Sequence, residues 1–106
     1  MKNPDAVLAL SAIAQEHRLA IYRLLVQAGP EGMPAGAIAE KLELPPSSLS
    51  FHLAHLTRAG LIGQRRESRS LIYSADFERM NALVEFLTNN CCGGQSCAPR
   101  GKATRA

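Results

Sequence analysis

Residues 46–62, PSSLSFHLAHLTRAGLI, are the stretch of the sequence that decides the fold. Leu49, Leu53 and Leu56 recur at the i, i+4 and i+7 spacing of one helix face, so one side of a predicted helix is apolar. Ala59-Gly60 ends this pattern. The opposite side gathers residues without negative charge: Ser47, Ser48, Ser50, Phe51, Ala54, His55 and Arg58. Such a face can lie against a polyanion, and an ordinary solvated helix face is the alternative that this stretch alone leaves open.

Length and charge favour a small nucleic-acid-binding domain. The chain has 106 residues and a formal net charge of +3, and its isoelectric point is near 9.0. A chain of this length buries a modest core, so self-association would add to its stability. Many basic residues fall in the second half: Arg58, Arg65, Arg66, Arg69, Arg100, Lys102 and Arg105. Nucleic acid is the expected partner class. A membrane-surface role is disfavoured, because these residues do not follow one helix face opposite bulky aromatics.

The cysteines and the N-terminal residues predict a cytoplasmic protein. Three cysteines within seven residues do not suit a secreted disulfide framework. The apolar run over residues 6–14 is short and continues as a helical pattern, which is unlike a signal peptide. We therefore expect no membrane partner.

The rest of the sequence predicts further helices and one hairpin. The elements expected are helices over residues 5–14, 16–28, 35–42 and 46–58, strands over 61–66 and 70–74, and a last helix that runs to about residue 90. Asn3 or Asp5 can cap the first of these helices, and Asp76 can cap the last. Pro45-Pro46 makes a tight turn before the 46–58 helix. The fold class is mainly α with a small β-hairpin, in the order α-α-α-α-β-β-α of a winged helix-turn-helix. Residues 1–90 form the DNA-binding and dimerisation domain, and residues 91–106 form a flexible tail that contains the cysteines.

The first and last predicted helices carry more apolar residues than the core of one monomer can bury. The last helix carries apolar residues on more than one face, so one stripe can cover the core while another meets a second subunit. The residues expected in this homodimer interface are Val7, Leu10, Met80, Val84 and Leu87.

Several short motifs, taken together, point to one family. They are His17-Arg18-Leu19 and Arg23-Leu24-Leu25, residues 48–56, Ala59-Gly60-Leu61-Ile62, and Arg66-Glu67-Ser68-Arg69 followed by Tyr73. Over about residues 7–90 the chain resembles the ArsR/SmtB family of metal-responsive repressors. The resemblance implies a homodimer whose paired recognition helices enter successive major grooves and whose wings touch the backbone or the minor groove.

The residues expected to contact DNA come from the recognition helix and the wing. They are Ser47, Ser48, Ser50, Phe51, His55, Arg58, Arg65, Arg66 and Arg69. His52 lies beside the leucine stripe, so we expect it to be half buried and hydrogen-bonded rather than to read a base. The serines have no base and acid partners at catalytic spacing, so no enzyme is expected.

Two metal sites known in the resembled family are missing from this sequence. Residues 34–36 are Pro-Ala-Gly where some members carry a Cys-x-Cys pair, and residues 76–90 lack the histidines that other members use on the last helix. Sensing through either site is therefore not expected.

The remaining candidate sensor is the segment Cys91-Cys92-Gly93-Gly94-Gln95-Ser96-Cys97. Two adjacent thiols followed by a Gly-Gly hinge can bring Cys97 to the same point as Cys91 and Cys92. Trivalent arsenic or antimony favours three sulfur ligands in a pyramid, whereas structural zinc would need a fourth ligand. Some members of the resembled family sense arsenite through cysteines near the carboxyl end, and this cluster is similar to theirs.

The sequence therefore predicts a DNA-binding repressor that leaves its operator when arsenite or antimonite binds the three cysteines. Two other functions stay open. The same cysteines could form a redox switch in a winged-helix repressor. Alternatively, the chain could be a metal-trafficking or interaction module that does not bind DNA.

Overall fold

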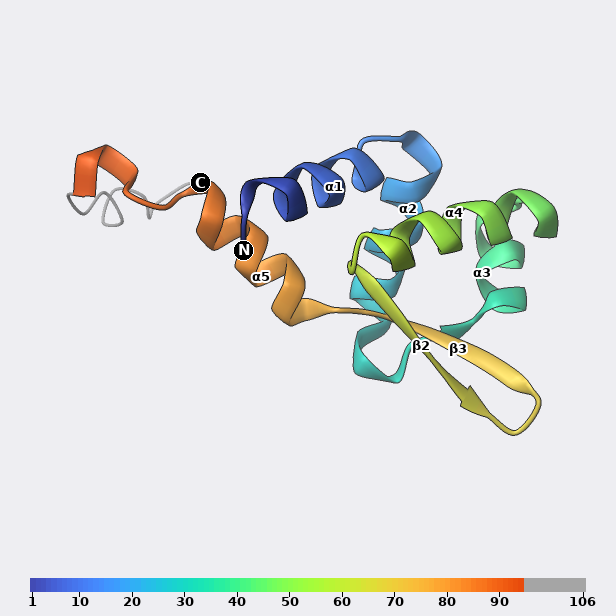
Figure 1. Cartoon of the computed structure of the whole chain (residues 1–106). Helices are drawn as coiled ribbons and strands as arrows, with labels where there is room; N and C mark the ends of the chain where they lie inside the picture. The colour runs from blue at the N-terminus through green and yellow to red at the C-terminus, as the bar shows by residue number, and fades with distance from the viewer. Residues whose placement is uncertain (95–106) are drawn as a thin grey trace.

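The computed structural model describes residues 1–94, except for the side chain of Cys91. Its helices are α1 (Asn3–Ile13), α2 (Glu16–Ala28), α3 (Ala35–Leu42), α4 (Pro46–Arg58) and α5 (Phe77–Leu87), its strands are β1 (Met33–Pro34), β2 (Ile62–Glu67) and β3 (Ser70–Ala75), and its short 3-10 turns are η1 (Gly29–Glu31) and η2 (Cys91–Gly94). Four helices precede the β2–β3 hairpin and α5 follows it, as Figure 1 shows. The predicted mainly helical fold with a hairpin wing is confirmed.

Local hydrogen bonds explain where the helices begin. The side chain of Gln15 accepts a hydrogen bond of 2.9 Å from the backbone N–H of Arg18 and caps α2. The carboxylate of Asp76 accepts one of 2.9 Å from the backbone N–H of Arg79, so the predicted cap of α5 is confirmed. The first helix begins earlier than expected, at Asn3, and Asp5 accepts a hydrogen bond from the backbone N–H of Lys2 instead of standing before the helix.

Two further features differ from the sequence prediction. Strand β1 pairs with β3 through Met33 opposite Tyr73, and this makes a three-stranded antiparallel sheet in the order β1-β3-β2. A two-residue strand that contains a proline has no alternating pattern to reveal it. Helix α5 ends at Leu87 rather than near residue 90, and the Thr88 hydroxyl donates a hydrogen bond of 2.9 Å back to the carbonyl of Val84.

One core joins the helices to the sheet. Its largest fully buried side chains are Ile21 and Leu25 of α2, Ile38 of α3, Leu49 and Leu56 of α4, and Leu61. Helix α1 packs through Ala6, Ala9 and Ala12, whose small side chains allow a close approach. The core thus holds α4 by one side and leaves its other side free.

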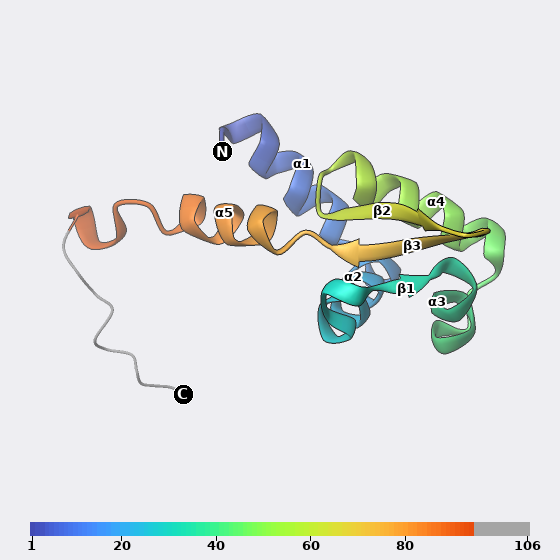
Figure 2. The ribbon, with the colours of Figure 1, turned by 90° about the horizontal axis from the view of Figure 1, so that it is seen from below.

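Helix α5 extends beyond this core next to α1, as Figures 1 and 2 show. Leu83 is its only buried residue, whereas Val84 and Leu87 are 52% and 55% exposed. On α1, Val7 is 64% exposed and Leu10 is 40% exposed. Within residues 1–94 no helix has the length and apolar character needed to cross a membrane.

The exposed apolar residues of α1 and α5 give a testable oligomeric state. Leu87→Glu should convert a dimer to monomers in sedimentation at micromolar concentration, because an unpaired charge buried in an apolar contact costs several kcal/mol. Val26→Glu is the matched control, since Val26 is an exposed apolar residue of α2 and should leave the dimer intact. A wild-type protein that sediments as a monomer would show that the two-helix interface is wrong.

Candidate nucleic-acid interface

Helix α4 has one face in the core and one face in solvent. Leu49, Leu53 and Leu56 are 2% exposed or less, whereas Phe51 is 63% exposed. Other predicted DNA-contacting residues of this helix also reach the surface: Ser47, Ser50 and Arg58 are exposed, and Ser48 and His55 are partly exposed. The helix therefore presents hydroxyl, aromatic and basic groups without a carboxylate, which suits the edges and phosphates of duplex DNA.

His52 is buried and contacts Arg18 rather than facing solvent. It is 9% exposed, and its Nδ1 lies 3.4 Å from Nη1 of Arg18, which is also 9% exposed. The guanidinium Nε of Arg18 donates a hydrogen bond to the carbonyl of Ala12 at the end of α1. The expected structural role of His52 is confirmed, and Arg18 links α1 to the recognition helix.

The histidines of α4 favour the neutral form. Burial lowers the pKa of His52 below its ordinary value, and the nearby cation of Arg18 lowers it further, followed by His17 and His55. Burial also lowers the pKa of His55, with additional contributions from Arg18 and Arg58. Nδ1 of His55 is buried and has no hydrogen-bond partner among the described residues. A neutral His52 can accept a hydrogen bond from Arg18, whereas a protonated one would face it with like charge.

The predicted wing arginines do not share one environment. Nε of Arg65 donates to a carboxylate oxygen of Glu67 at 2.8 Å, and its Nη2 donates to the carbonyl of Glu31 in η1, also at 2.8 Å. Arg66 is exposed on β2, and Arg69 is exposed at the hairpin tip beside Ser68, whose φ is +56°. The wing is therefore fastened to η1 by one of the arginines expected to contact DNA.

A contact missed by the sequence analysis joins α5 to the end of α4. Arg79 of α5 lies against Gly60, where an added Cβ would stand 2.9 Å from its Nε. Nη2 of Arg79 also lies 3.8 Å from Oδ1 of Asp5 on α1. Gly60 is the sequence signal that could have indicated this contact. Its φ is +79°, and the absence of a Cβ leaves room for the side chain of Arg79.

The cysteine segment is described only in part. Cys92 is exposed in η2, where its φ is +57°, and Gly93 has a φ of +67°. Cys97 lies outside the described residues, as does the side chain of Cys91. Within the part of the chain that the structure describes, no three His, Cys, Asp or Glu side chains gather as a metal site. The three-cysteine site stays a prediction.

Comparisons with known proteins agree with this geometry. A family model described as a helix-turn-helix domain matches residues 13–65. The transcriptional activator HlyU of Vibrio cholerae serotype O1 is 36% identical over 87 residues, which cover 82% of this chain and 78% of HlyU. The nodulation protein NolR of Rhizobium meliloti is 35% identical over 91 residues, which cover 83% of this chain and 72% of NolR.

Solved structures share this fold over most of the chain. HlyU from Vibrio cholerae N16961 superposes with a TM-score of 0.68 at 34% identity, covering 87% of this chain and 99% of that chain. A structure described as reduced HlyU gives a TM-score of 0.64 at 34% identity, covering 84% and 90%. A homodimeric winged helix-turn-helix domain from Mycobacterium bovis, described as a possible ArsR-family regulator, gives 0.66 at 25% identity, covering 87% and 85%.

The lowered pKa of His52 predicts a loss of stability in mild acid. In the unfolded chain His52 titrates near its ordinary pKa of about 6.5, so the unfolded state takes up protons first as the pH falls. The thermal midpoint should therefore drop between about pH 7 and pH 5. His52→Gln, which keeps an acceptor for Arg18 but does not titrate, should reduce this drop, and His55→Gln should do so independently. If the thermal midpoint of both variants fell with pH as steeply as that of the wild type, protonation of these two histidines would not be the cause of the loss of stability.

The free face of α4 should determine sequence preference. Phe51→Ala and Ser47→Ala should weaken binding to the operator, by about 1–3 kcal/mol for a lost base contact, and change binding to random duplex little. Arg69→Ala is the control, because loss of a phosphate contact should weaken binding to both kinds of DNA. Fluorescence anisotropy at fixed salt measures both affinities. Equal losses on both DNAs for the α4 variants would refute the assignment.

Proposed function

This chain belongs to the ArsR-like winged helix-turn-helix family of DNA-binding transcriptional regulators, and on that premise we propose that it is a homodimeric repressor released from its operator by arsenite or antimonite. Its named relatives are transcriptional regulators, and the chain is not an enzyme. Membership of a DNA-binding family also overturns the alternative of a module that does not bind DNA. We expect the repressor to act in the cytoplasm, where its operator would be bound.

The dimer would set the spacing of the two recognition helices. The exposed apolar residues of α1 and α5 are available to pack against a second copy of the chain, and the homodimeric Mycobacterium bovis relative supports such an assembly. Paired α4 helices must lie about 34–36 Å apart to enter successive major grooves. A small change in the packing of α1 and α5 would therefore alter the fit to DNA.

The observation that carries the proposal is the position of the cysteine segment relative to α5. Helix α5 ends at Leu87, and the turn η2 that begins at Cys91 follows within one helical turn's length of chain. Soft trivalent metalloids prefer thiolate ligands, so capture at this point would act directly on the end of the dimerisation helix. The Cys91, Cys92 and Cys97 thiols together provide the three sulfurs that such an ion favours.

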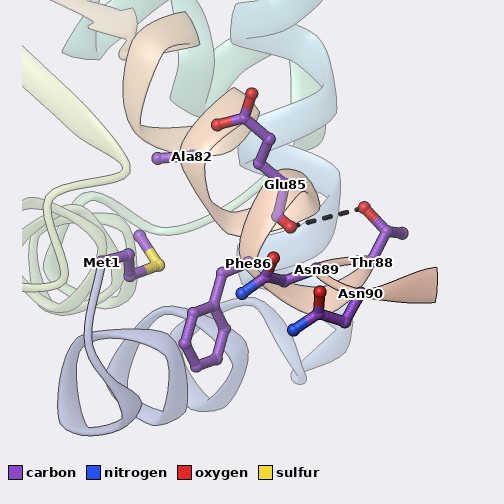
Figure 3. A pocket seen from close by; sticks show the side chains of 7 residues that line it. All are labelled: Met1, Ala82, Glu85, Phe86, Thr88, Asn89 and Asn90. Carbon is purple, nitrogen blue, oxygen red and sulfur yellow. Dashed lines mark hydrogen bonds between the residues drawn. The ribbon is translucent and has the colours of Figure 1, made fainter. Parts of the chain in front are cut away.

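Helix α5 contacts α1 and the end of α4 near its start, whereas its last turn borders a cavity. A cavity of about 550 Å³ separates the last turn of α5 from the start of the chain and is lined by Met1, Ala82, Glu85, Phe86, Thr88, Asn89 and Asn90. Figure 3 shows Met1 facing Phe86 across it. In the first turn of α5, Arg79 lies against Gly60 at the end of α4 and close to Asp5 of α1. A shift of α5 would thus reach both α1 and the recognition helix.

A redox switch is the second candidate function. It is supported by the similarity to the structure described as reduced HlyU from Vibrio cholerae N16961. In this chain Cys97 would form a disulfide with Cys91 or Cys92. HlyU is named a transcriptional activator, so whether this chain represses or activates its target has to be measured.

Serine substitutions separate these functions. Cys91→Ser, Cys92→Ser and Cys97→Ser should each still bind the upstream DNA but lose release by arsenite, because a hydroxyl does not ionise near neutral pH and binds a thiophilic ion poorly. Anisotropy of labelled DNA measures both properties. A weakened response that persists only in Cys97→Ser would identify a two-sulfur site.

Two other results would replace the proposal. Release by arsenite in all three variants would show that the cysteines are not the sensor, and release of the wild type by peroxide alone would establish the redox function. A reporter gene behind the upstream promoter gives the direction. Its expression should rise when the chain is deleted, and a fall would indicate an activator.

A further inference from the structure

The side chain of Arg18 joins three helices at the carboxyl end of α1. Arg18 belongs to the first turn of α2, and its Nε donates a hydrogen bond to the carbonyl of Ala12 in the last turn of α1. Its Nη1 lies 3.4 Å from Nδ1 of His52, near the middle of α4. The last turn of α1 contains no basic residue of its own, so Arg18 supplies both a donor and a positive charge to the carbonyls at that helix end.

The contact between Arg18 and His52 requires a neutral imidazole. A guanidinium can only donate hydrogen bonds, so Nδ1 of His52 must be unprotonated in order to accept one. Both residues are only 9% exposed, and water therefore has little access to separate them. Protonation of His52 would remove the acceptor and place a second positive charge beside the guanidinium.

The groups around His52 oppose its protonation. Burial lowers its pKa most, and three groups lower it further: Arg18 and His17 of α2 and His55 of α4. For His55, burial is again the largest cause of a lowered pKa, followed by Arg18 and Arg58. Helices α1 and α3 and strand β2 also pack on α4, but none of their described charged groups is among these causes. Among the described residues, no carboxylate therefore offsets a positive charge on His52.

His52 also contacts the side chains on the free face of α4. Its ring centroid lies 5.7 Å from that of Phe51, which is 63% exposed. The ring centroids of Phe51 and His55 lie 6.4 Å apart. A change in the position of the His52 ring would therefore alter the packing of two side chains that are expected to contact DNA.

We propose that Arg18 and His52 are positioning residues for operator recognition, and that uptake of a proton by His52 breaks their contact and lowers the preference of the protein for its operator over other DNA. With His52 neutral, Arg18 holds α4 against the carboxyl end of α1. With His52 protonated, the like charges separate, and α4 loses this hydrogen-bonded connection. The proton comes from solvent and no covalent bond changes. This inference rests on the operator binding of the proposed function and is independent of arsenite.

The measurement is the ratio of two dissociation constants, that for a random duplex divided by that for the operator, from about pH 7.5 to about pH 5 at constant ionic strength. The ratio is needed because protonated histidines strengthen binding to every duplex. In the wild type it should fall by about tenfold, which corresponds to a difference of one pKa unit for His52 between the two complexes. Circular dichroism and sedimentation define the pH range in which the protein is a folded dimer. A constant ratio over that range would overturn the proposal.

His52→Gln and His55→Gln form a matched pair, because each replaces one histidine of α4 with a side chain that does not titrate. The operator preference of His52→Gln should stay constant as the pH falls, since glutamine keeps an acceptor for Arg18. His55→Gln should retain the fall of about tenfold seen in the wild type, whatever its affinity at neutral pH. The opposite pattern would assign the proton to His55 and overturn the proposal.

Arg18→Lys tests the other member of the pair. Lysine keeps the positive charge but lacks the planar fork that reaches both the carbonyl of Ala12 and His52. At about pH 7.5 the operator preference of this variant should already equal the value that the wild type reaches in acid, and it should change little with pH. Wild-type preference with wild-type pH dependence would overturn the role of Arg18. Failure of the wild type to bind any duplex would instead refute the proposed function.

Discussion

The burial of Leu49, Leu53 and Leu56 is the constraint on which the molecule depends. These side chains hold α4 against α2 and the sheet, and each is 2% exposed or less. Because one side of α4 packs in the core, its other side faces solvent, and Phe51, Ser47 and Ser50 lie there. The same packing places α4 next to β2, and a cavity of about 340 Å³ lies between these elements and β3.

Two arginines connect this helix to α1 and α5. Arg18 joins the end of α1 to His52 in the middle of α4, and Arg79 joins α5 and the start of α1 to Gly60 at the end of α4. Both guanidiniums reach across element boundaries with several donors in a fixed plane, which a lysine could not reproduce. The recognition helix therefore cannot be displaced far without a change in α1 or α5. In the proposed function, these contacts would couple the packing of α1 and α5 to the recognition helix.

The sequence predicted the elements well because their signals are local. Leucine spacing, the Pro45-Pro46 turn and the Asp76 cap each act within a few residues, and the structure has α2, α3 and α4 at the expected positions. It did not predict β1, whose pairing with β3 joins residues far apart in the chain. The same is true of the site. The free face of α4 followed from periodicity, whereas the contacts of Arg65 with Glu31 and of Arg79 with Gly60 join residues far apart in the chain.

The central claim is that metalloid binding at the cysteine segment and operator binding at α4 oppose each other. Thermodynamic linkage requires that this opposition be reciprocal. The most direct measurement is therefore the arsenite affinity of the protein, by calorimetric titration, with and without saturating operator DNA. We predict that bound DNA lowers the affinity for arsenite by the same factor by which bound arsenite lowers the affinity for DNA, on the order of 5- to 150-fold. Equal arsenite affinities for the free and the DNA-bound dimer would contradict it.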